Sequence, residues 1–378
     1  MADCFSVATS AMPSHTGLEF GPFVLHEELG RGGMAVVYRA ESRKPDSLGR
    51  MVALKQPLSQ NGFDLDFDVV RSFIDEARLA TRFAHPNVAR TYSLGKVGHR
   101  YFIEMEYVPG PTLSQLAAQS EDAGAIPIPV VVQILIQICD ALEHVHGMCD
   151  DAGTPMGLVH RDVSLSNIIV SPGGVVKLID FGIVKGHSTQ ARTAVGTIKG
   201  KAAYVAPEYL RGRIDSRADL FALGTVAHEL LTDRRLFRGA NDLETVNRVQ
   251  SMCIFPPSRW REEVPRGLDA IVMKALERDP DQRWQTAAEL RAALVALECG
   301  ASDPSQIQHW VGWAFAQLPR RQTSEILHVI EALESAVSMP IPVLPARESE
   351  PARRTAGIAA MIGAIAGVMG VLTYLALT

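Results

Sequence analysis

The first third of the chain carries short apolar runs typical of β-strands. Val-, Leu- and Tyr-rich runs recur between Phe23 and Val108, and Gly, Pro or Asp residues separate them. One stretch, VVRSFIDEARLATRF, instead has apolar residues at helical spacing. The predicted strands are FVLHEELG, AVVYRA, RMVALKQ, VARTYSLG and RYFIEMEYV. This region is therefore expected to be a small sheet with one helix packed on it.

Beyond Pro109-Gly110-Pro111 the pattern becomes mainly helical. Two long segments, VVVQILIQICDALEHVH and LFALGTVAHELL, are apolar at helical spacing. Thr286 and Glu289 have the spacing of a capping box, which predicts the start of a further helix. The pattern thus predicts an α+β fold with a small β-rich lobe followed by a larger helical lobe.

Changes in composition divide the chain into six predicted segments. The N-terminal residues mix Ser, Thr, Pro and Met without periodicity, and a Pro-rich charged stretch separates two amphipathic helices from the C-terminus. The segments are a flexible tail (1–19), the β-rich lobe (20–108), the helical lobe (109–299), a helical extension (300–338), a linker (339–352) and an apolar segment (353–378).

The apolar C-terminal segment is long enough to cross a membrane. The 24 residues from Thr355 to Thr378 contain no charge, and as a helix they would span about 36 Å, more than the ~30 Å hydrocarbon core. Arg353 and Arg354 precede the segment and favour a cytoplasmic N-terminal side. We therefore predict a single-pass transmembrane helix, with the preceding lobes in the cytoplasm.

Small residues recur along the predicted membrane helix. Ala359, Gly363 and Gly367 are four residues apart, a spacing that lets two helices approach closely in lipid. Glycine is also common in membrane helices that do not associate. The pattern nevertheless suggests self-association of the chain as a homodimer.

Charge and cysteine usage exclude several classes of function. The net charge is −5, from 42 acidic and 37 basic residues, so no broad basic field indicates a nucleic-acid partner. Five scattered cysteines lack the paired spacing of a zinc site or a disulfide framework. The N-terminus has no basic segment followed by an apolar run, so no cleavable export signal is expected.

A glycine-rich turn lies between the first two predicted strands. It contains Gly30, Arg31, Gly32 and Gly33, and glycines let backbone N–H groups approach a phosphate closely. Such a turn alone is more typical of a simple hairpin. The order of the following residues changes this interpretation, because Lys55 lies on the next strand and Glu76 on the following helix, where they can form an ion pair.

An ordered series of short motifs then completes a family pattern. The series is His160-Arg161-Asp162, Asn167, Asp180-Phe181-Gly182 and Ala206-Pro207-Glu208. With these motifs, the stretch from about Phe20 to Leu297 resembles the protein kinase domain, specifically that of the bacterial Hanks-type serine/threonine kinases. Asp219-Leu-Phe-Ala-Leu-Gly224 and Arg283 fit later positions of the same pattern. The resemblance implies the two-lobed kinase fold, with ATP and Mg2+ (alternatively Mn2+) as cofactors and protein Ser/Thr hydroxyls as substrates.

The resemblance also implies a role for each motif residue. Lys55, steadied by Glu76, is expected to bind the α- and β-phosphates, and Asn167 and Asp180 are expected to hold Mg2+. Asp162 is expected to orient the substrate hydroxyl and accept its proton. The nucleotide-binding set implied by the family comprises Gly30, Arg31, Gly32, Gly33, Val37, Ala53, Lys55, Met105, Glu106, Val108 and Ile169.

Two departures from the family pattern concern the catalytic loop. Ser164 stands where most Ser/Thr kinases have a lysine that reaches the γ-phosphate, and Lys201 stands where the family usually has the threonine that contacts this lysine. We hypothesise that Lys201 supplies the missing cation near Asp162. The alternative is an exposed lysine without a catalytic part. A smaller departure is Ala35 in place of the third glycine of the turn.

Arg161 resembles the arginine of kinases whose activation segment is ordered by phosphorylation. A phosphate adds about two negative charges with which Arg161 could pair. The candidate acceptors are Ser188, Thr189, Thr193 and Thr197.

The pattern leaves three classes of function open. They are an active membrane-anchored kinase that autophosphorylates, a nucleotide-binding pseudokinase scaffold, and an adaptor that binds partners through residues 306–337. The complete set of catalytic motif residues favours the first, because a scaffold has no chemical need for all of them.

Overall fold

A computed structural model describes residues 17–33, 35–58, 67–118, 125–182, 201–212, 214–297, 307, 308 and 310. The chain divides into two units, Met1–Leu318 and Pro319–Thr378, and every described residue belongs to the first. Residues 1–16, most of the predicted helical extension, the linker, the predicted transmembrane helix and the four candidate phosphorylation sites lie outside the described residues.

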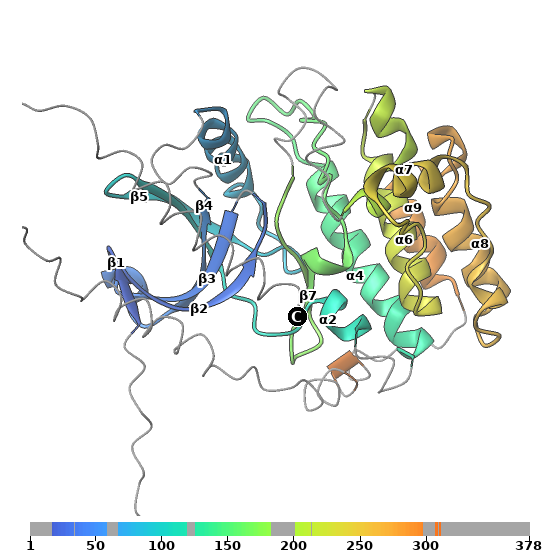
Figure 1. Ribbon diagram of the computed structural model, residues 1–378, viewed down its shortest axis with the longest axis horizontal. Helices are drawn as coiled ribbons and strands as arrows, with labels where there is room; N and C mark the ends of the chain where they lie inside the picture. Colours follow the sequence, from blue (N-terminus) through green and yellow to red (C-terminus); the bar gives the residue numbers. More distant parts are fainter. Residues whose placement is uncertain are drawn as a thin grey trace, which may run out of the picture. The chain divides into compact units, whose positions relative to one another are not determined.

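The N-terminal lobe is one antiparallel sheet with a helix beside it (Figure 1). The sheet has the order β1-β2-β3-β4-β6-β5. All five predicted strands are present, and a sixth, β1, begins at Leu18, inside the stretch expected to be a flexible tail. The elements are β1 (Leu18–Phe20), β2 (Phe23–Arg31), β3 (Ala35–Ser42), η1 (Pro45–Ser47), β4 (Met51–Pro57), α1 (Phe67–Ala80), β5 (Thr91–Val97) and β6 (Arg100–Glu106).

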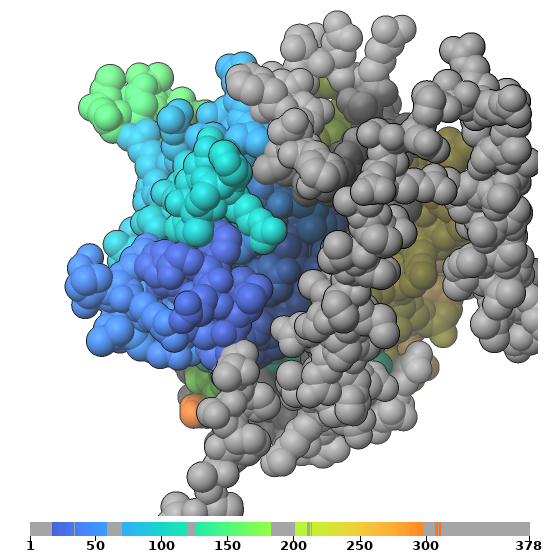
Figure 2. Space-filling view, turned by 60° about the vertical axis from the view of Figure 1, so that its left-hand side comes forward, coloured from blue at the N-terminus to red at the C-terminus, as the bar shows by residue number. Residues whose placement is uncertain are grey.

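Aromatic packing explains why β1 joins the sheet. The rings of Phe20 and Phe23 pack edge-on against Phe102, with centroids 5.8 and 5.2 Å away. A second cluster, containing Phe73 and Ala77 of α1 and Ile103 of β6, fixes the helix on the sheet. Figure 2 shows the outer surface of this lobe in blue to cyan. This packing sets the position of Glu76, which neighbours Ala77 on α1.

The C-terminal lobe is mainly helical, as the sequence predicts (Figure 1). A two-stranded antiparallel ribbon, β7 with β8, accompanies its helices. The helices and strands are α2 (Leu113–Ala117), α4 (Ile128–His146), β7 (Ile168–Val170), β8 (Val176–Leu178), α6 (Arg217–Thr232), α7 (Asp242–Ser251), α8 (Arg266–Ala275) and α9 (Ala287–Val295). Short 3-10 turns connect them: η2 (Leu165–Asn167), η4 (Ala202–Tyr204), η5 (Pro207–Arg211), η6 (Pro257–Arg259) and η7 (Pro280–Gln282).

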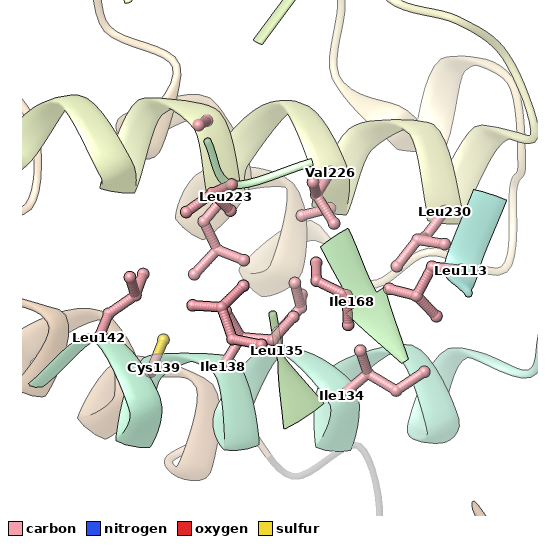
Figure 3. Packing of buried hydrophobic residues seen from close by; sticks show 14 of the residues in the cluster. Leu113, Ile134, Leu135, Ile138, Cys139, Leu142, Ile168, Leu223, Val226 and Leu230 are labelled. Carbon is pink, nitrogen blue, oxygen red and sulfur yellow. The ribbon is translucent and has the colours of Figure 1, made fainter. Parts of the chain in front are cut away.

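Helices α4 and α6 form the centre of this lobe. Figure 3 shows Ile134 and Ile138 of α4 facing Leu223 and Val226 of α6, with Ile168 of β7 between the two helices. Within the described residues, α4 is the one helix whose length and apolarity would suit a membrane, but it is mostly buried in this core. Its apolar character is therefore explained by packing inside the lobe.

Helix α6 approaches its neighbour α8 unusually closely. A Cβ built on Gly224 would lie 2.9 Å from the Cβ of Ala275, closer than real Cβ contacts allow. The polar residues Asp219 and Glu229 of α6 are also buried, and hydrogen bonds compensate both of them. The helix thus serves as a buried support for the loops that cross it.

The predicted capping box of α9 is half present. The Thr286 hydroxyl accepts a hydrogen bond from the backbone N–H of Glu289 at 3.1 Å, but the Glu289 carboxylate accepts from Gln285 N rather than from Thr286 N. The helix begins where the sequence predicts. Farther along, Ile307 is fully buried in the core of the lobe and Trp310 packs against the same core, so these residues of the predicted extension contact the C-terminal lobe.

Candidate active site

Lys55 joins three elements of the candidate site. Its Nζ lies 2.8 Å from Oε1 of Glu76 on α1 and 2.9 Å from Oδ1 of Asp180, which follows β8. The side chains are 13%, 17% and 30% exposed, respectively. The structure therefore brings together a cation and a carboxylate from the N-terminal lobe with a carboxylate from the C-terminal lobe.

These carboxylates keep Lys55 charged. Burial alone would lower the pKa of Lys55, but the negative charges of Asp180 and Glu76 outweigh burial and raise that pKa well above its usual range. Lys55 consequently remains a fixed positive charge at physiological pH. A buried fixed cation is suited to binding phosphate oxygens.

The loop that carries Asp162 is held from beneath by Asp219 of α6. One carboxylate oxygen of Asp219 accepts from His160 N at 2.7 Å and the other from Arg161 N at 2.8 Å. His146 Nε2 contacts the same carboxylate at 2.8 Å. Arg161 has a φ of 65°, a strained conformation for a residue with a side chain. The bonds to Asp219 stabilise this turn.

Burial affects the pKa of both Asp219 and His160. Burial would raise the pKa of Asp219, but the hydrogen bond and charge of His146 lower it below its ordinary value. Burial lowers the pKa of His160 despite the nearby carboxylates. His160 therefore stays neutral, and its Nδ1 accepts a hydrogen bond from Asp162 N at 3.2 Å.

Asp162, Asn167 and Lys201 meet at one point. Lys201 Nζ donates to Asp162 Oδ2 at 2.9 Å and to Asn167 Oδ1 at 3.2 Å. The Asn167 Nδ2 donates to the backbone oxygen of Asp162 at 2.8 Å, which orients the amide. Lys201 is not a solvated lysine without a partner, since its ammonium contacts two of the expected catalytic residues.

Ser164 is buried next to this group. It is 1% exposed, and its hydroxyl lies 3.1 Å from the Ser166 hydroxyl. A short neutral side chain supplies no cation at this position. The ammonium of Lys201 pairs with the Asp162 carboxylate at 2.9 Å.

The glycine-rich turn forms the predicted hairpin between β2 and β3. Gly30 pairs with Val37, and Gly32 N donates to Ala35 O at 2.8 Å. A Cβ built on Gly30 or Gly33 would meet no atom within 4 Å, so the turn is open on that side. The Arg31 guanidinium pairs with Glu28 at 2.5 Å.

The residues expected around the adenine ring are brought into register by strand pairing. Val37 of β3 pairs with Lys55, and Ala53 pairs with Met105 of β6. Beyond Met105 the chain passes Glu106 and the buried Val108 before it enters the C-terminal lobe, where β7 carries Ile169.

A close backbone contact fixes this passage between the lobes. Gly110 has a φ of 144°, and a Cβ there would lie 2.2 Å from Val170 O. Lys177 of β8 also reaches Oε2 of Glu106 at 2.9 Å. The linking segment is thus attached to both strands of the β7–β8 ribbon, and β7 carries Ile169.

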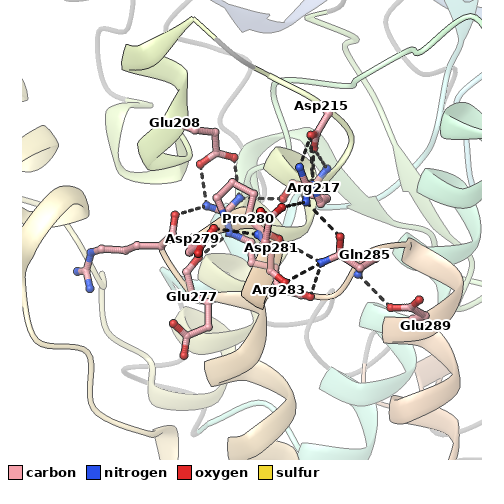
Figure 4. Close-up of polar contacts among 11 residues, drawn as sticks. Glu208, Asp215, Arg217, Glu277, Asp279, Pro280, Asp281, Arg283, Gln285 and Glu289 are labelled. Carbon is pink, nitrogen blue, oxygen red and sulfur yellow. Dashed lines mark hydrogen bonds and ion pairs between the residues drawn. The ribbon is translucent and has the colours of Figure 1, made fainter.

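Glu208 and Arg283 form a buried ion pair in the C-terminal lobe (Figure 4). Two guanidinium nitrogens of Arg283 contact the two carboxylate oxygens of Glu208 at 2.6 and 2.7 Å. Arg283 also donates to the carbonyl groups of Glu277, Arg278 and Arg217. The pair fixes the segment after Lys201 to the helical lobe.

The donors present fit a magnesium nucleotide. Asn167 and Asp180 offer hard oxygen ligands, and Mg2+ usually takes only one or two protein carboxylates or amides together with phosphates and water. Asp180 has a φ of 55°, and such strained conformations cluster at functional sites. Lys55 provides the cation that phosphate oxygens require.

The protein kinase domain family matches residues 23–294 of this chain. The chain belongs to the protein kinase family, and its two lobes have the kinase fold. The solved Mycobacterium tuberculosis PknI kinase domain is similar in structure, with 25% identity and a TM-score of 0.55, covering 74% of this chain and 97% of that one.

Curated relatives match the same region. The chain is 39% identical over 277 residues to the tyrosine-protein kinase MasK of Myxococcus xanthus, which covers 73% of this chain and 43% of MasK. It is 33% identical to the serine/threonine-protein kinase PknB of Mycobacterium leprae (74% of this chain, 43% of PknB) and 32% identical to PrkC of Bacillus subtilis (72% and 40%). The aligned region spans about two fifths of these relatives.

Two positioning contacts were not predicted from sequence. His146 carried no motif that would connect it to Asp219, and Lys177 is an isolated lysine on a short strand. The i+2 alternation of β8, which places Lys177 on the opposite face of the ribbon from Val176 and Leu178, was the only available signal.

Proposed function

We propose that this chain is an ATP- and Mg2+-dependent protein kinase that transfers the γ-phosphate of ATP to Ser/Thr hydroxyls of proteins. The observation that carries the proposal is the contact of Lys55 with both Glu76 and Asp180. In protein kinases the lysine–glutamate pair and the metal-binding aspartate must both be in place for phosphoryl transfer.

The proposed reaction moves a proton and a phosphoryl group. The substrate hydroxyl gives its proton to a carboxylate oxygen of Asp162 while its oxygen bonds to the γ-phosphorus, and the bond between that phosphorus and the β–γ bridging oxygen breaks to release ADP. Lys55 binds the α- and β-phosphates, and Asn167 and Asp180 are the residues that would hold Mg2+. Bound Mg2+ neutralises charge on the phosphates.

Lys201 is proposed to supply the cation that Ser164 lacks. Its contact with Asp162 places a positive charge beside the residue that accepts the substrate proton. A preorganised charge stabilises developing negative charge on the transferring group. This role would maintain the activity despite the departure at position 164.

Tyrosine is the second candidate acceptor. PknB and PrkC carry serine/threonine in their names, whereas MasK is named a tyrosine-protein kinase. Phosphoamino-acid analysis of a labelled generic substrate distinguishes the two: phosphoserine or phosphothreonine supports the proposal, and phosphotyrosine alone replaces it.

The test of activity itself is transfer of labelled phosphate to the chain or to a generic basic protein, with Asp162→Asn as the blank. Label in the wild type and none in the variant supports the kinase. Nucleotide binding without transfer by either protein would instead indicate the pseudokinase scaffold. For the adaptor, deletion of residues 311–338, which keeps the buried Ile307 and the partly buried Trp310, should leave ATP binding intact, and loss of a partner would favour that class.

Autophosphorylation of the activation segment is part of the proposal. Mass mapping after incubation with ATP should find phosphate on one or more of the four candidates, Ser188, Thr189, Thr193 and Thr197. A fully active enzyme with an unmodified segment would remove this element of the proposal.

Membrane anchoring is proposed from residues 353–378. Their length and lack of charge after Arg354 suit one membrane crossing. The full chain should fractionate with membranes and a chain ending at residue 352 should not. Homodimer formation through Gly363 and Gly367 is tested with Gly363→Ile in an in-membrane association assay, where retained association would contradict it.

A further inference from the structure

The amide oxygen of Asn167 has a positively charged neighbour. Lys201 Nζ lies 3.2 Å from Asn167 Oδ1 while also contacting Asp162. Asn167 is only 4% exposed, and its Nδ2 donates to Asp162 O, so Oδ1 is the atom that faces the ammonium. The oxygen expected to serve as a metal ligand is therefore already in contact with a cation of the protein.

The backbone that carries Lys201 is held against the C-terminal lobe. Lys201 immediately precedes η4, and the next two residues, Ala202 and Ala203, are buried against the helical lobe. The buried pair Glu208–Arg283 fixes the same segment a few residues later. The backbone that carries Lys201 is anchored at this point, and the ammonium is 2.9 Å from Asp162 as a consequence of that anchoring.

Two cations cannot share one amide oxygen without strong repulsion. In protein kinases, the aspartate after β8 and the catalytic-loop asparagine together hold two Mg2+ ions, the asparagine binding the second. A lysine ammonium and a second Mg2+ at Asn167 Oδ1 would stand within a few ångströms of each other, beside an asparagine that is only 4% exposed, although the Lys201 side chain itself is 39% exposed. One of them must leave.

We propose that the Lys201 ammonium takes the place of the second divalent cation, so that the nucleotide complex of this protein holds one divalent ion, at Asp180. The metal-binding role that the family implies for Asn167 is then replaced by its contact with Lys201. This inference rests on the proposed function for the presence of the nucleotide. The single charge of Lys201 then neutralises phosphate charge from the side of Asn167, and its presence there depends on the anchored activation segment and not on the metal concentration.

The test counts bound Mn2+, which substitutes for Mg2+ and is detected by electron paramagnetic resonance. The full chain in detergent is saturated with a non-hydrolysable ATP analogue and titrated with Mn2+. The wild type should bind one Mn2+ per nucleotide, and Lys201→Met should bind two. Adding Asn167→Ala to the Lys201→Met variant should return the count to one.

A matched control removes a lysine elsewhere. Lys274 lies on α8 with its Nζ 3.8 Å from the centre of the Trp284 ring, and Lys274→Met should bind one Mn2+, as the wild type does. Two Mn2+ ions in the wild type, or a single ion in a folded Lys201→Met variant, would overturn the inference. Failure of the proposed function is distinguishable, because one bound Mn2+ without phosphate transfer would contradict the kinase activity and leave the metal count standing.

Discussion

Lys55 of β4 and Glu76 of α1 are joined by a 2.8 Å contact between Nζ and Oε1, and Asp180 lies on the other side of the same ammonium at 2.9 Å. One lysine therefore links the sheet, the helix and the segment after β8. The position of the Lys55 ammonium, which is expected to bind phosphate, therefore depends on where α1 packs.

Removing the Lys55 charge should abolish most transfer. Lys55→Met should lower kcat/KM at least about 100-fold, since a preorganised charge at the phosphates is lost. Glu76→Gln should cost less, about 10-fold, because a neutral hydrogen bond replaces a charge-assisted one and Asp180 still holds the lysine. Steady-state kinetics measures both. Equal activity of Lys55→Met and wild type would contradict the assigned role.

The pH dependence of the site should not reflect Lys55. The carboxylates of Asp180 and Glu76 raise its pKa above the ordinary value near 10.5, so the ammonium persists throughout pH 6–9. The pH–activity profiles of the wild type and of Glu76→Gln should be compared over that range. Any loss of activity at alkaline pH should occur at the same pH in both proteins. A shift of that loss to lower pH in Glu76→Gln would mean that Lys55 titrates in this range.

Lys201 should be required for turnover, but a lysine placed at position 164 should partly replace it. Lys201→Ala should lower kcat about 100-fold, by loss of one stabilising charge at the reacting group. The exchange variant Ser164→Lys/Lys201→Thr should recover part of that activity, because the cation returns from the catalytic loop. Near-full kcat in Lys201→Ala would contradict the hypothesis. Lys274→Met serves as the control for loss of a lysine.

The buried pair Glu208–Arg283 should be costly to break on one side. Arg283→Met leaves the Glu208 carboxylate buried without its guanidinium and should lower the free energy of unfolding by about 3–5 kcal/mol. Urea denaturation measures this. The exposed pair Glu244–Arg248, with both side chains 40% exposed, is the matched control. Arg248→Met should lower the free energy of unfolding by about 1 kcal/mol or less. A similar loss of stability in both variants would contradict the larger effect assigned to the buried pair.

Asp219 should stabilise the fold in a pH-dependent way. Its folded pKa is lowered, chiefly by the hydrogen bond from His146 against the opposing effect of burial. Its ionised form thus contributes stability above the unfolded pKa of about 3.9, and this contribution is lost as the pH falls through the lower folded pKa. Asp219→Asn should cost about 2–3 kcal/mol near pH 7.

The difference between wild type and Asp219→Asn is the quantity to follow. Urea unfolding at several pH values should give a constant difference above about pH 5 and a smaller one below about pH 4. Asp281→Asn, whose carboxylate is 78% exposed in its pair with Arg217, should change stability little at any pH. A difference for Asp219→Asn that grows on acidification would have the wrong sign.

Alternation and helical spacing predicted strands β2 to β6 and helices α1, α4, α6 and α9, because each depends on which side chains face a core. The short elements β7, β8 and α2 and the helices α7 and α8 were not predicted. The strand β1 was missed because three residues carry too little periodicity, and only the rings of Phe23 and Phe102 show why Phe20 is buried. The capping box of α9 was predicted at the correct residue, but the Glu289 carboxylate bonds one residue earlier than the motif implies.

The sequence by itself determined which chemical groups this protein has: the order of the kinase motifs, the serine at position 164, the lysine at position 201 and an uncharged C-terminal segment. Only the tertiary structure decided that Lys201 contacts both Asp162 and Asn167, and that His146 and Asp219 hold the catalytic loop. The physical reason is that these contacts join residues 34 to 73 positions apart. Their distances depend on how α4, α6 and the segment that begins at Lys201 pack, and no local pattern encodes that packing.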